Sequence, residues 1–200
     1  MKPAKLILIG IVAAVQLAVP ASMLWGRERT LREGALFRFQ TAPVDPYDAF
    51  RGRYVALSAG SHTAEWTGPT SPLRRSTGVF VTLGTDSNGF AETRTASLRR
   101  PASGSYIRAT AWGSAIEGQR VNVRLPIERF YLPEAEAPAA EIAYREHSRR
   151  GRQEAVVLVR VRSGDLVVED LLVEETPIRV WLAEQARISH EDADPSRETQ

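Results

Sequence analysis

"EAVVLVRVRSGDLVVEDLLVE", residues 154–174, reads as two strands joined by a tight turn. Val and Leu dominate both runs, and apolar and polar residues alternate at 159–162, which is the period of a half-buried strand. Ser163-Gly164 between them favours a hairpin connection. Residues 156–159 are apolar on both faces, so we expect the first of the two strands in the middle of a sheet.

Similar short runs recur along the chain. The clearest is "RVNVRL", residues 120–125, in which every second residue is apolar. Further strands are predicted at 35–41, 53–59, 79–84, 90–98 and 105–112. The segment 86–89, "DSNG", predicts a tight hairpin turn because Asn and Gly both accept positive φ. About eight strands at short spacing predict a mainly β fold, an antiparallel barrel or sandwich.

A single short helix interrupts the predicted strands. Pro138 is suited to its first turn, and Glu141 and Arg145 form an i,i+4 pair. Its apolar stripe is predicted to consist of Ala139, Ile142 and Ala143. We expect this helix to lie on the surface of the sheet.

Two other segments are less regular. Residues 61–77 are rich in Ser, Thr, Gly and Pro, which predicts the longest irregular connection of the domain. "TPIRVWLAEQAR", residues 176–187, is compatible with a strand or with a short helix. We divide the chain into an anchor (1–26), a helical extension that stops at Gly34 (27–34), a β domain (35–182) and a disordered tail (183–200).

The anchor is predicted from Leu6 to Trp25, a run of 20 residues without a charge. At about 1.5 Å per residue, such a helix spans the roughly 30 Å hydrocarbon layer of a membrane. The alternative is a signal peptide cleaved after Ala21, but the run exceeds the usual ~7–15 apolar residues, which favours a retained signal-anchor. An anchor behind a short basic start predicts a single-pass protein of the cytoplasmic membrane, its domain facing the periplasm or cell exterior.

Charge and cysteine content exclude several function classes. Of the 26 basic residues, Lys2 and Lys5 precede the apolar run, so the remaining 24 equal the 24 acidic residues. This neutral domain predicts no nucleic-acid partner. The absence of cysteine excludes disulfides and thiolate chemistry, and the three histidines show no metal-ligand or catalytic spacing. We therefore predict no metal, no cofactor and no catalytic residues.

Two polar clusters remain, "TAPVDPYDAFRGRYVAL" at 41–57 (block 1) and "IERFYLPE" at 127–134 (block 2). Asp-Pro, Asp and Gly in block 1 suit a turn that leads into a strand. Isolated buried charges are costly, so we expect the blocks to pack together with an arginine of one bound to a carboxylate of the other. The candidate binding residues are Asp45, Asp48, Arg51, Gly52, Arg53, Tyr54, Leu57, Glu128, Arg129 and Glu134.

These two blocks closely resemble the signature blocks of the GDYXXLXY family, and the likeness covers roughly residues 1–173. The name-giving motif falls on Gly52, Arg53, Tyr54, Leu57 and Ala59, with Arg53 in place of the family aspartate and Ala59 in place of the last tyrosine. The resemblance implies a bacterial protein with one N-terminal membrane span and an extracytoplasmic domain. It brings no assigned activity, and such proteins are often encoded beside polytopic membrane proteins.

We therefore expect a non-enzymatic envelope protein that binds a partner, with the cytoplasmic membrane and a polytopic membrane protein as its expected contacts. The alternative is a hydrolase of an envelope substrate that uses carboxylates such as Asp45, Asp48 and Glu128, because paired carboxyl groups can share acid and base roles.

Overall fold

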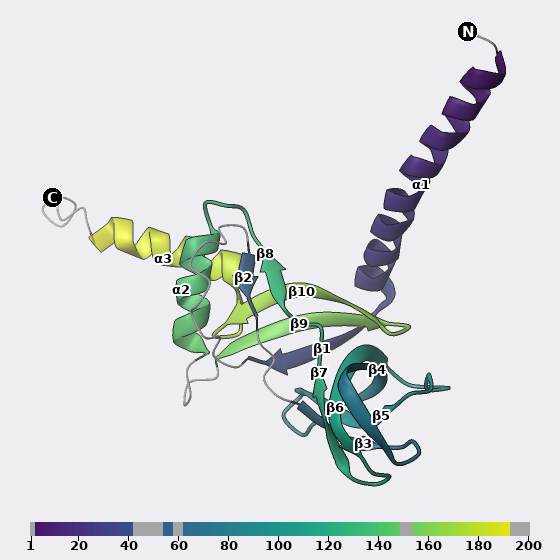
Figure 1. Cartoon of the computed structure of the whole chain (residues 1–200). Coiled ribbons are helices and arrows are strands. Elements are labelled where there is room, and N and C mark those ends of the chain that lie inside the picture. The colour runs from purple at the N-terminus through teal and green to yellow at the C-terminus, as the bar shows by residue number, and fades with distance from the viewer. Residues whose placement is uncertain (1–2, 42–53, 58–61, 149–153, 193–200) are drawn as a thin grey trace, which may run out of the picture.

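The computed structural model describes residues 3–41, 54–57, 62–148 and 154–192, excepting the side chains of 3–4, 6–10, 56, 75 and 189–192. Within this part the fold is mainly β, with a closed five-strand barrel, a four-strand sheet, a two-strand ladder and three helices. The sheet lies between the barrel and a pair of helices, while the first helix projects from the opposite end of the sheet (Figure 1).

The four-strand sheet has the order β1-β9-β10-β11. Strand β9 (Ala155–Arg162) lies between β1 (Ala35–Gln40) and β10 (Asp165–Val173), and β11 (Thr176–Pro177) closes the edge. The predicted central position of the 154–162 strand is therefore confirmed. The apolar residues that alternate along β1 and β9 are buried, as the sequence predicts: Phe37, Phe39, Val157, Val159 and Val161.

The barrel closes in the order β3-β5-β4-β6-β7. Its strands are β3 (His62–Trp66), β4 (Ser71–Thr85), β5 (Ala91–Ser97), β6 (Tyr106–Ala115) and β7 (Arg120–Arg124). Strands β3 and β5 pair in parallel, so the prediction of a wholly antiparallel fold is wrong at this seam. A barrel is thus present, but it accounts for only part of the β structure.

Trp66 is completely buried in the barrel, and its indole N–H donates to the Pro69 carbonyl at 3.0 Å. Small residues share the buried core with it, among them Ala64, Ala96 and Ala111, each with no exposed surface. A narrow barrel needs such small residues to accommodate one large ring.

The prediction of an irregular connection at 61–77 is wrong. Residues 62–66 form β3, whose Ala64 and Trp66 are buried in alternation, and β4 begins at Ser71. Strand β4 contains a bulge between Leu73 and Thr77, where Ser76 adopts a φ of 69°. Composition misled the prediction because Ser, Thr and Pro are tolerated where a strand bulges.

The predicted turn between β4 and β5 is found at the expected place but is wider than a two-residue Asn-Gly turn. Gly89 alone of the pair has positive φ, at 83°. The Asp86 carboxylate accepts hydrogen bonds from the backbone N–H groups of Asn88 and Phe90, both at 2.8 Å. Aspartate therefore organises this turn.

Helix α2 (Ala137–His147) corresponds to the predicted short helix, and its Glu141–Arg145 pair is confirmed at 2.8 Å. The predicted apolar stripe is wrong in part, because Ala139 is exposed and Ile142 is 58% exposed, whereas Ala143 is buried. The buried face is rotated around the helix and consists of Ala137, Ala140, Ala143, Tyr144 and His147.

One helix is predicted within the β domain, besides the N-terminal one, and that prediction is incomplete because the described residues contain a further helix. Helix α3 (Ile178–Asp192) decides between the two alternatives at 176–187 in favour of a helix. It continues through residues 183–192, which the sequence assigns to a disordered tail. Residues 193–200 lie outside the described residues.

Helix α1 (Pro3–Glu33) is joined directly to β1. The Gly34 N–H donates to the Thr30 carbonyl at 2.9 Å, and a Cβ at Gly34 would lie only 2.3 Å from that oxygen. The Arg162 guanidinium of β9 lies 3.0 Å from the Glu33 carboxylate. The helix therefore ends at the predicted glycine, and its last turn is fixed to the sheet.

Apolar side chains of α1 are exposed along its projecting part, including Leu17 (73%), Leu24 (71%) and Trp25 (75%). Among the described residues, no helix combines the length and hydropathy needed to cross a membrane. The side chains of residues 6–10, the first part of the predicted span, lie outside the described part.

Candidate functional site

The described parts of block 1 and block 2 lie side by side. Strand β2 (Tyr54–Ala56) pairs with β8 (Arg129–Tyr131), so that Tyr54 opposes Tyr131. The ladder continues where the Leu57 N–H donates to the Glu128 carbonyl at 2.9 Å. The two blocks are therefore neighbours at residues 54–57 and 128–131, whereas the turn at 45–52, which the sequence predicts to pack beside block 2, lies outside the described residues. Asp45, Asp48, Arg51, Gly52 and Arg53 lie outside the described residues, so the ion pair between the blocks stays a prediction.

The side chains along this ladder form a cluster of two tyrosines and an arginine. The Arg129 guanidinium lies 5.0 Å from the centre of the Tyr54 ring, and the Tyr54 and Tyr131 rings meet edge to face at 5.7 Å. A hydrogen bond with Tyr131, together with the proximity of Tyr54, raises the pKa of Arg129. Leu57 is buried beneath the ladder, so its role is structural.

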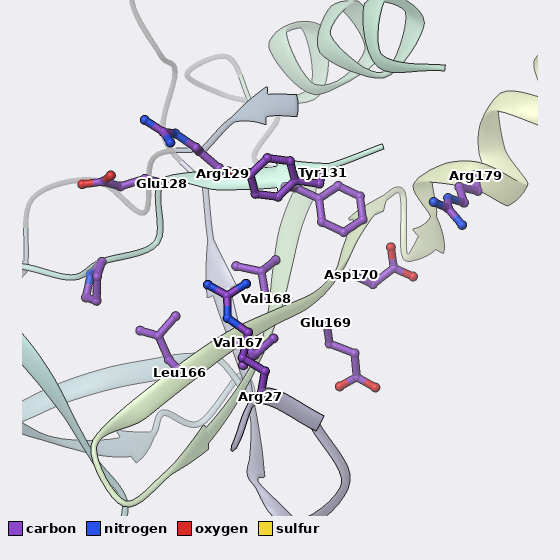
Figure 2. Close-up of a pocket in the computed structure, with 12 residues that line it drawn as sticks. Arg27, Glu128, Arg129, Tyr131, Leu166, Val167, Val168, Glu169, Asp170 and Arg179 are labelled. Carbon is purple, nitrogen blue, oxygen red and sulfur yellow. The ribbon is translucent and has the colours of Figure 1, made fainter. Parts of the chain in front are cut away.

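A groove of about 480 Å³ lies between β8, β10 and the base of α1 (Figure 2). Its apolar part is formed by Leu166, Val167 and Val168 of β10. Two predicted site residues, Glu128 and Arg129, are among its lining residues, whereas Glu134 is exposed outside it. The charged residues that line the groove are Arg27, Glu128, Arg129, Glu169, Asp170 and Arg179.

A bulge in β10 lies at the two acidic residues of this strand that line the groove. The register with β9 shifts between Val168 and Asp170, so that Glu169 is the extra residue. The Glu169 carboxylate is bound by Arg160 at 2.6 Å and is thereby neutralised. Burial raises the pKa of Asp170, although a hydrogen bond from the Leu171 N–H (2.7 Å) and the charge of Arg179 oppose that shift.

A second cavity, of about 460 Å³, adjoins the groove along α1. Its lining includes Met23, Gly26 and Thr30 of the helix, and it shares Arg27 and Leu166 with the groove. The groove therefore extends from β8 to the part of α1 where the apolar run ends.

Arg27, Asp170 and Arg179 belong to this site but were not among the residues predicted for it. The sequence holds one signal for Asp170, because two consecutive acids interrupt the apolar run of "DLVVEDLLVE". Arg27 and Arg179 come from helices at opposite ends of the chain. Only the folded chain brings them together.

With its apolar floor and charges of both signs on its rim, the groove suits a segment that is itself partly apolar and partly charged. Its described lining residues include carboxylates and a tyrosine but no histidine, serine or lysine.

Comparison with known proteins identifies one family. The model of the family described as GDYXXLXY protein matches residues 16–171, which include both blocks and the residues of β10 that line the groove. No curated protein and no solved structure matches the chain. The chain therefore belongs to the GDYXXLXY family.

Proposed function

We propose that this protein is a membrane-anchored, extracytoplasmic β domain that binds another membrane protein through the groove between α1, β8 and β10. The observation that carries the proposal is the position of the groove, at the base of a helix whose apolar side chains are exposed. Trp25 suits the boundary between hydrocarbon and water, and Arg27 two residues later lines the groove. A partner bound there would itself lie close to the membrane surface.

The chemistry of the groove supports a protein partner. Leu166, Val167 and Val168 offer apolar surface, while Arg27 and Arg179 offer charge to a partner's carboxylates. The neutral overall charge of the domain gives no field that would attract nucleic acid. Specificity would then come from matching a mixed apolar and charged segment, as at protein interfaces.

Affinity capture from detergent extracts of native membranes tests the partner. The wild-type chain is expected to bring down a membrane protein, and the double variant Arg27→Glu, Arg179→Glu is expected to lose it, because both rim charges are reversed. Arg99→Glu, an exposed arginine outside the groove, is the matched control and should retain the partner. Recovery of the wild-type chain alone, at native abundance, would contradict the proposal.

Protease treatment of spheroplasts tests the orientation separately. Digestion of the domain in intact spheroplasts is expected for an extracytoplasmic domain, and protection until lysis would show the opposite orientation. Release of the domain into the soluble fraction would favour a cleaved signal peptide over the retained anchor.

One observation favours the hydrolase as a second candidate function. Glu128 and Asp170 line the same groove, and burial raises the pKa of Asp170, which is the direction that a general acid requires. Any turnover of an envelope polymer should then be lost in Glu128→Gln and in Asp170→Asn. Turnover that persists in both variants would exclude these carboxylates as catalytic groups.

A further inference from the structure

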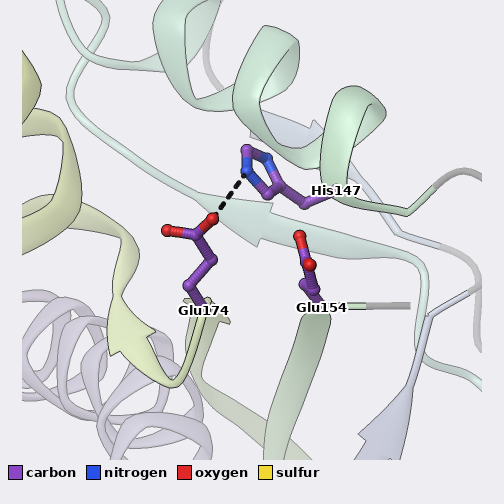
Figure 3. A group of neighbouring side chains, drawn as sticks. All are labelled: His147, Glu154 and Glu174. Carbon is purple, nitrogen blue, oxygen red and sulfur yellow. Dashed lines mark ion pairs between the residues drawn. The ribbon is translucent and has the colours of Figure 1, made fainter. Parts of the chain in front are cut away.

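A second polar cluster lies at the other end of the sheet from α1 (Figures 1 and 3). His147 is the last residue of α2, Glu154 immediately precedes β9, and Glu174 immediately follows β10. One ligand atom from each residue lies within 4.8 Å of the other two. Three residues separated by 7 and 20 positions in the sequence thus converge on one point.

The backbone holds these three residues together. The Glu154 N–H donates to the His147 carbonyl at 3.0 Å, and the Glu174 N–H donates to the Glu154 carbonyl at 3.1 Å. Glu174 adopts a φ of 51°, a left-handed conformation that costs free energy for a residue other than glycine. The fold maintains this conformation, so the backbone positions of the three residues are set without a ligand.

The hydrogen bonding of His147 determines which of its two ring nitrogens carries the proton. The imidazole Nδ1 lies 2.8 Å from the Ala143 carbonyl oxygen, which can only accept, so Nδ1 carries a proton. In the neutral ring Nε2 is then an unprotonated acceptor, and it lies 3.5 Å from the Glu174 carboxylate. Two acceptors that face each other in this way require a cation between them, either a proton on Nε2 or a metal ion.

The geometry points to a metal ion, and we propose that His147, Glu154 and Glu174 bind a divalent transition metal of the zinc class. Two ligands on tetrahedral zinc, with bonds of about 2.0–2.1 Å, lie roughly 3.3–3.4 Å apart, close to the 3.5 Å between Nε2 and the Glu174 oxygen. A direct hydrogen bond would bring them to about 2.9 Å. Two carboxylates neutralise the ion, and imidazole nitrogen favours a transition metal over calcium or magnesium.

Outer contacts of the kind found around metal ligands are also present. The Ala143 carbonyl fixes the tautomer of His147, and the Trp181 indole N–H lies 3.3 Å from the second oxygen of Glu174. The Trp181 ring also packs edge to face on the His147 ring at 5.4 Å. Such contacts orient ligands and exclude water from one side of the ion. A bound ion would therefore connect the end of α2, the start of β9, the end of β10 and, through Trp181, helix α3.

Metal titration of the full chain in detergent, after treatment with a chelator, tests this site. Zn²⁺ is expected to bind at one equivalent per chain by calorimetry and to raise the melting temperature, and Co²⁺ should give visible absorption bands. Glu174→Gln and Glu154→Gln should weaken Zn²⁺ binding by at least about tenfold, as loss of a ligand does. His147→Gln should abolish the cobalt bands.

Two controls separate loss of ligand from loss of fold. Glu146→Gln removes an exposed carboxylate from the same helix and should leave Zn²⁺ affinity unchanged. His147 is buried, so its variant is checked by circular dichroism, and if it does not fold the exposed Glu174 variant decides. Absence of Zn²⁺ and Co²⁺ binding by the folded wild type would overturn the proposal. Equal Zn²⁺ binding by wild type, Glu154→Gln and Glu174→Gln would overturn it as well.

Discussion

The barrel and the sheet of this protein use buried polar groups differently. In the barrel, Thr93 is the one buried polar residue among those described, whereas Thr41, His147 and Ser148 gather beside the sheet and Thr30 lies at the base of α1. The groove and the His147, Glu154 and Glu174 cluster also border the sheet. The barrel core is thus mainly apolar, while the buried polar residues and both candidate sites gather at the sheet.

The substitution Trp66→Ala tests the structural role of the barrel and has the largest expected effect. Removal of a fully buried indole leaves a cavity, which costs about 3–5 kcal/mol of unfolding free energy and about 10 °C in melting temperature. Differential scanning calorimetry measures both. Trp25→Ala, at a site 75% exposed, is the control and should leave the melting temperature unchanged. Equal melting temperatures of the two variants would contradict the structural role of the barrel core.

A matched pair of threonines compares the two regions directly. The Thr41 hydroxyl donates to the Ala155 carbonyl at 2.9 Å and lies 3.2 Å from the Ser148 hydroxyl. The Thr93 hydroxyl donates to the Thr63 carbonyl at 2.9 Å. Thr41→Val should cost about 1–2 kcal/mol and Thr93→Val about 1 kcal/mol or less, because the Thr41 hydroxyl contacts two buried polar groups, the Ala155 carbonyl and the Ser148 hydroxyl. Denaturant unfolding measures the loss of unfolding free energy in each variant. A larger loss in Thr93→Val than in Thr41→Val would contradict the view that buried polar contacts matter more beside the sheet than in the barrel.

Asp170 offers the smallest effect, and its sign depends on pH. Because burial raises its pKa in the folded state, Asp170 contributes most to stability below its unfolded pKa, and this contribution is lost as the pH rises through its folded pKa. Asp170→Asn should therefore melt slightly higher than wild type at pH 7, and the difference should vanish near pH 3. Asp165→Asn, which loses an ion pair with Arg108, should show no such gain at neutral pH. A lower melting temperature for Asp170→Asn at pH 7 would show that the Arg179 interaction outweighs burial.

Regular alternation was the most reliable guide to this fold. It predicted β1 and β7, each with one buried face, while the continuous apolar run at 156–159 predicted the central place of β9. It failed at β3, where "HTAEW" is short and lies in a segment rich in turn-forming residues. The buried face of α2 was misplaced because Ile142 is apolar yet 58% exposed, and only packing against the sheet determines which face is covered.

The candidate sites were less predictable because they depend on contacts between distant segments. Tyr54, Glu128 and Arg129 were predicted because each block carries an unusual density of charge within a short stretch. These three residues do lie along one ladder. Arg179 and Glu174 gave no local signal, as each is an ordinary charged residue in the sequence. Their partners become neighbours only through the β9 and β10 pairing and the return of α3 across the sheet edge.

The direct junction between α1 and β1 has a mechanical consequence. Gly34 alone separates helix from strand, and bonds from Arg162 to Glu33 and from Arg160 to the Gly34 carbonyl (3.2 Å) brace it on the side of β9. Helix α1 and the sheet are therefore expected to move as one rigid body, so that a change in the tilt of α1 changes the orientation of the groove by the same angle. A flexible tether would let the domain move freely about the helix, whereas this junction keeps the groove beside the residues of α1 that line it, Arg27 among them.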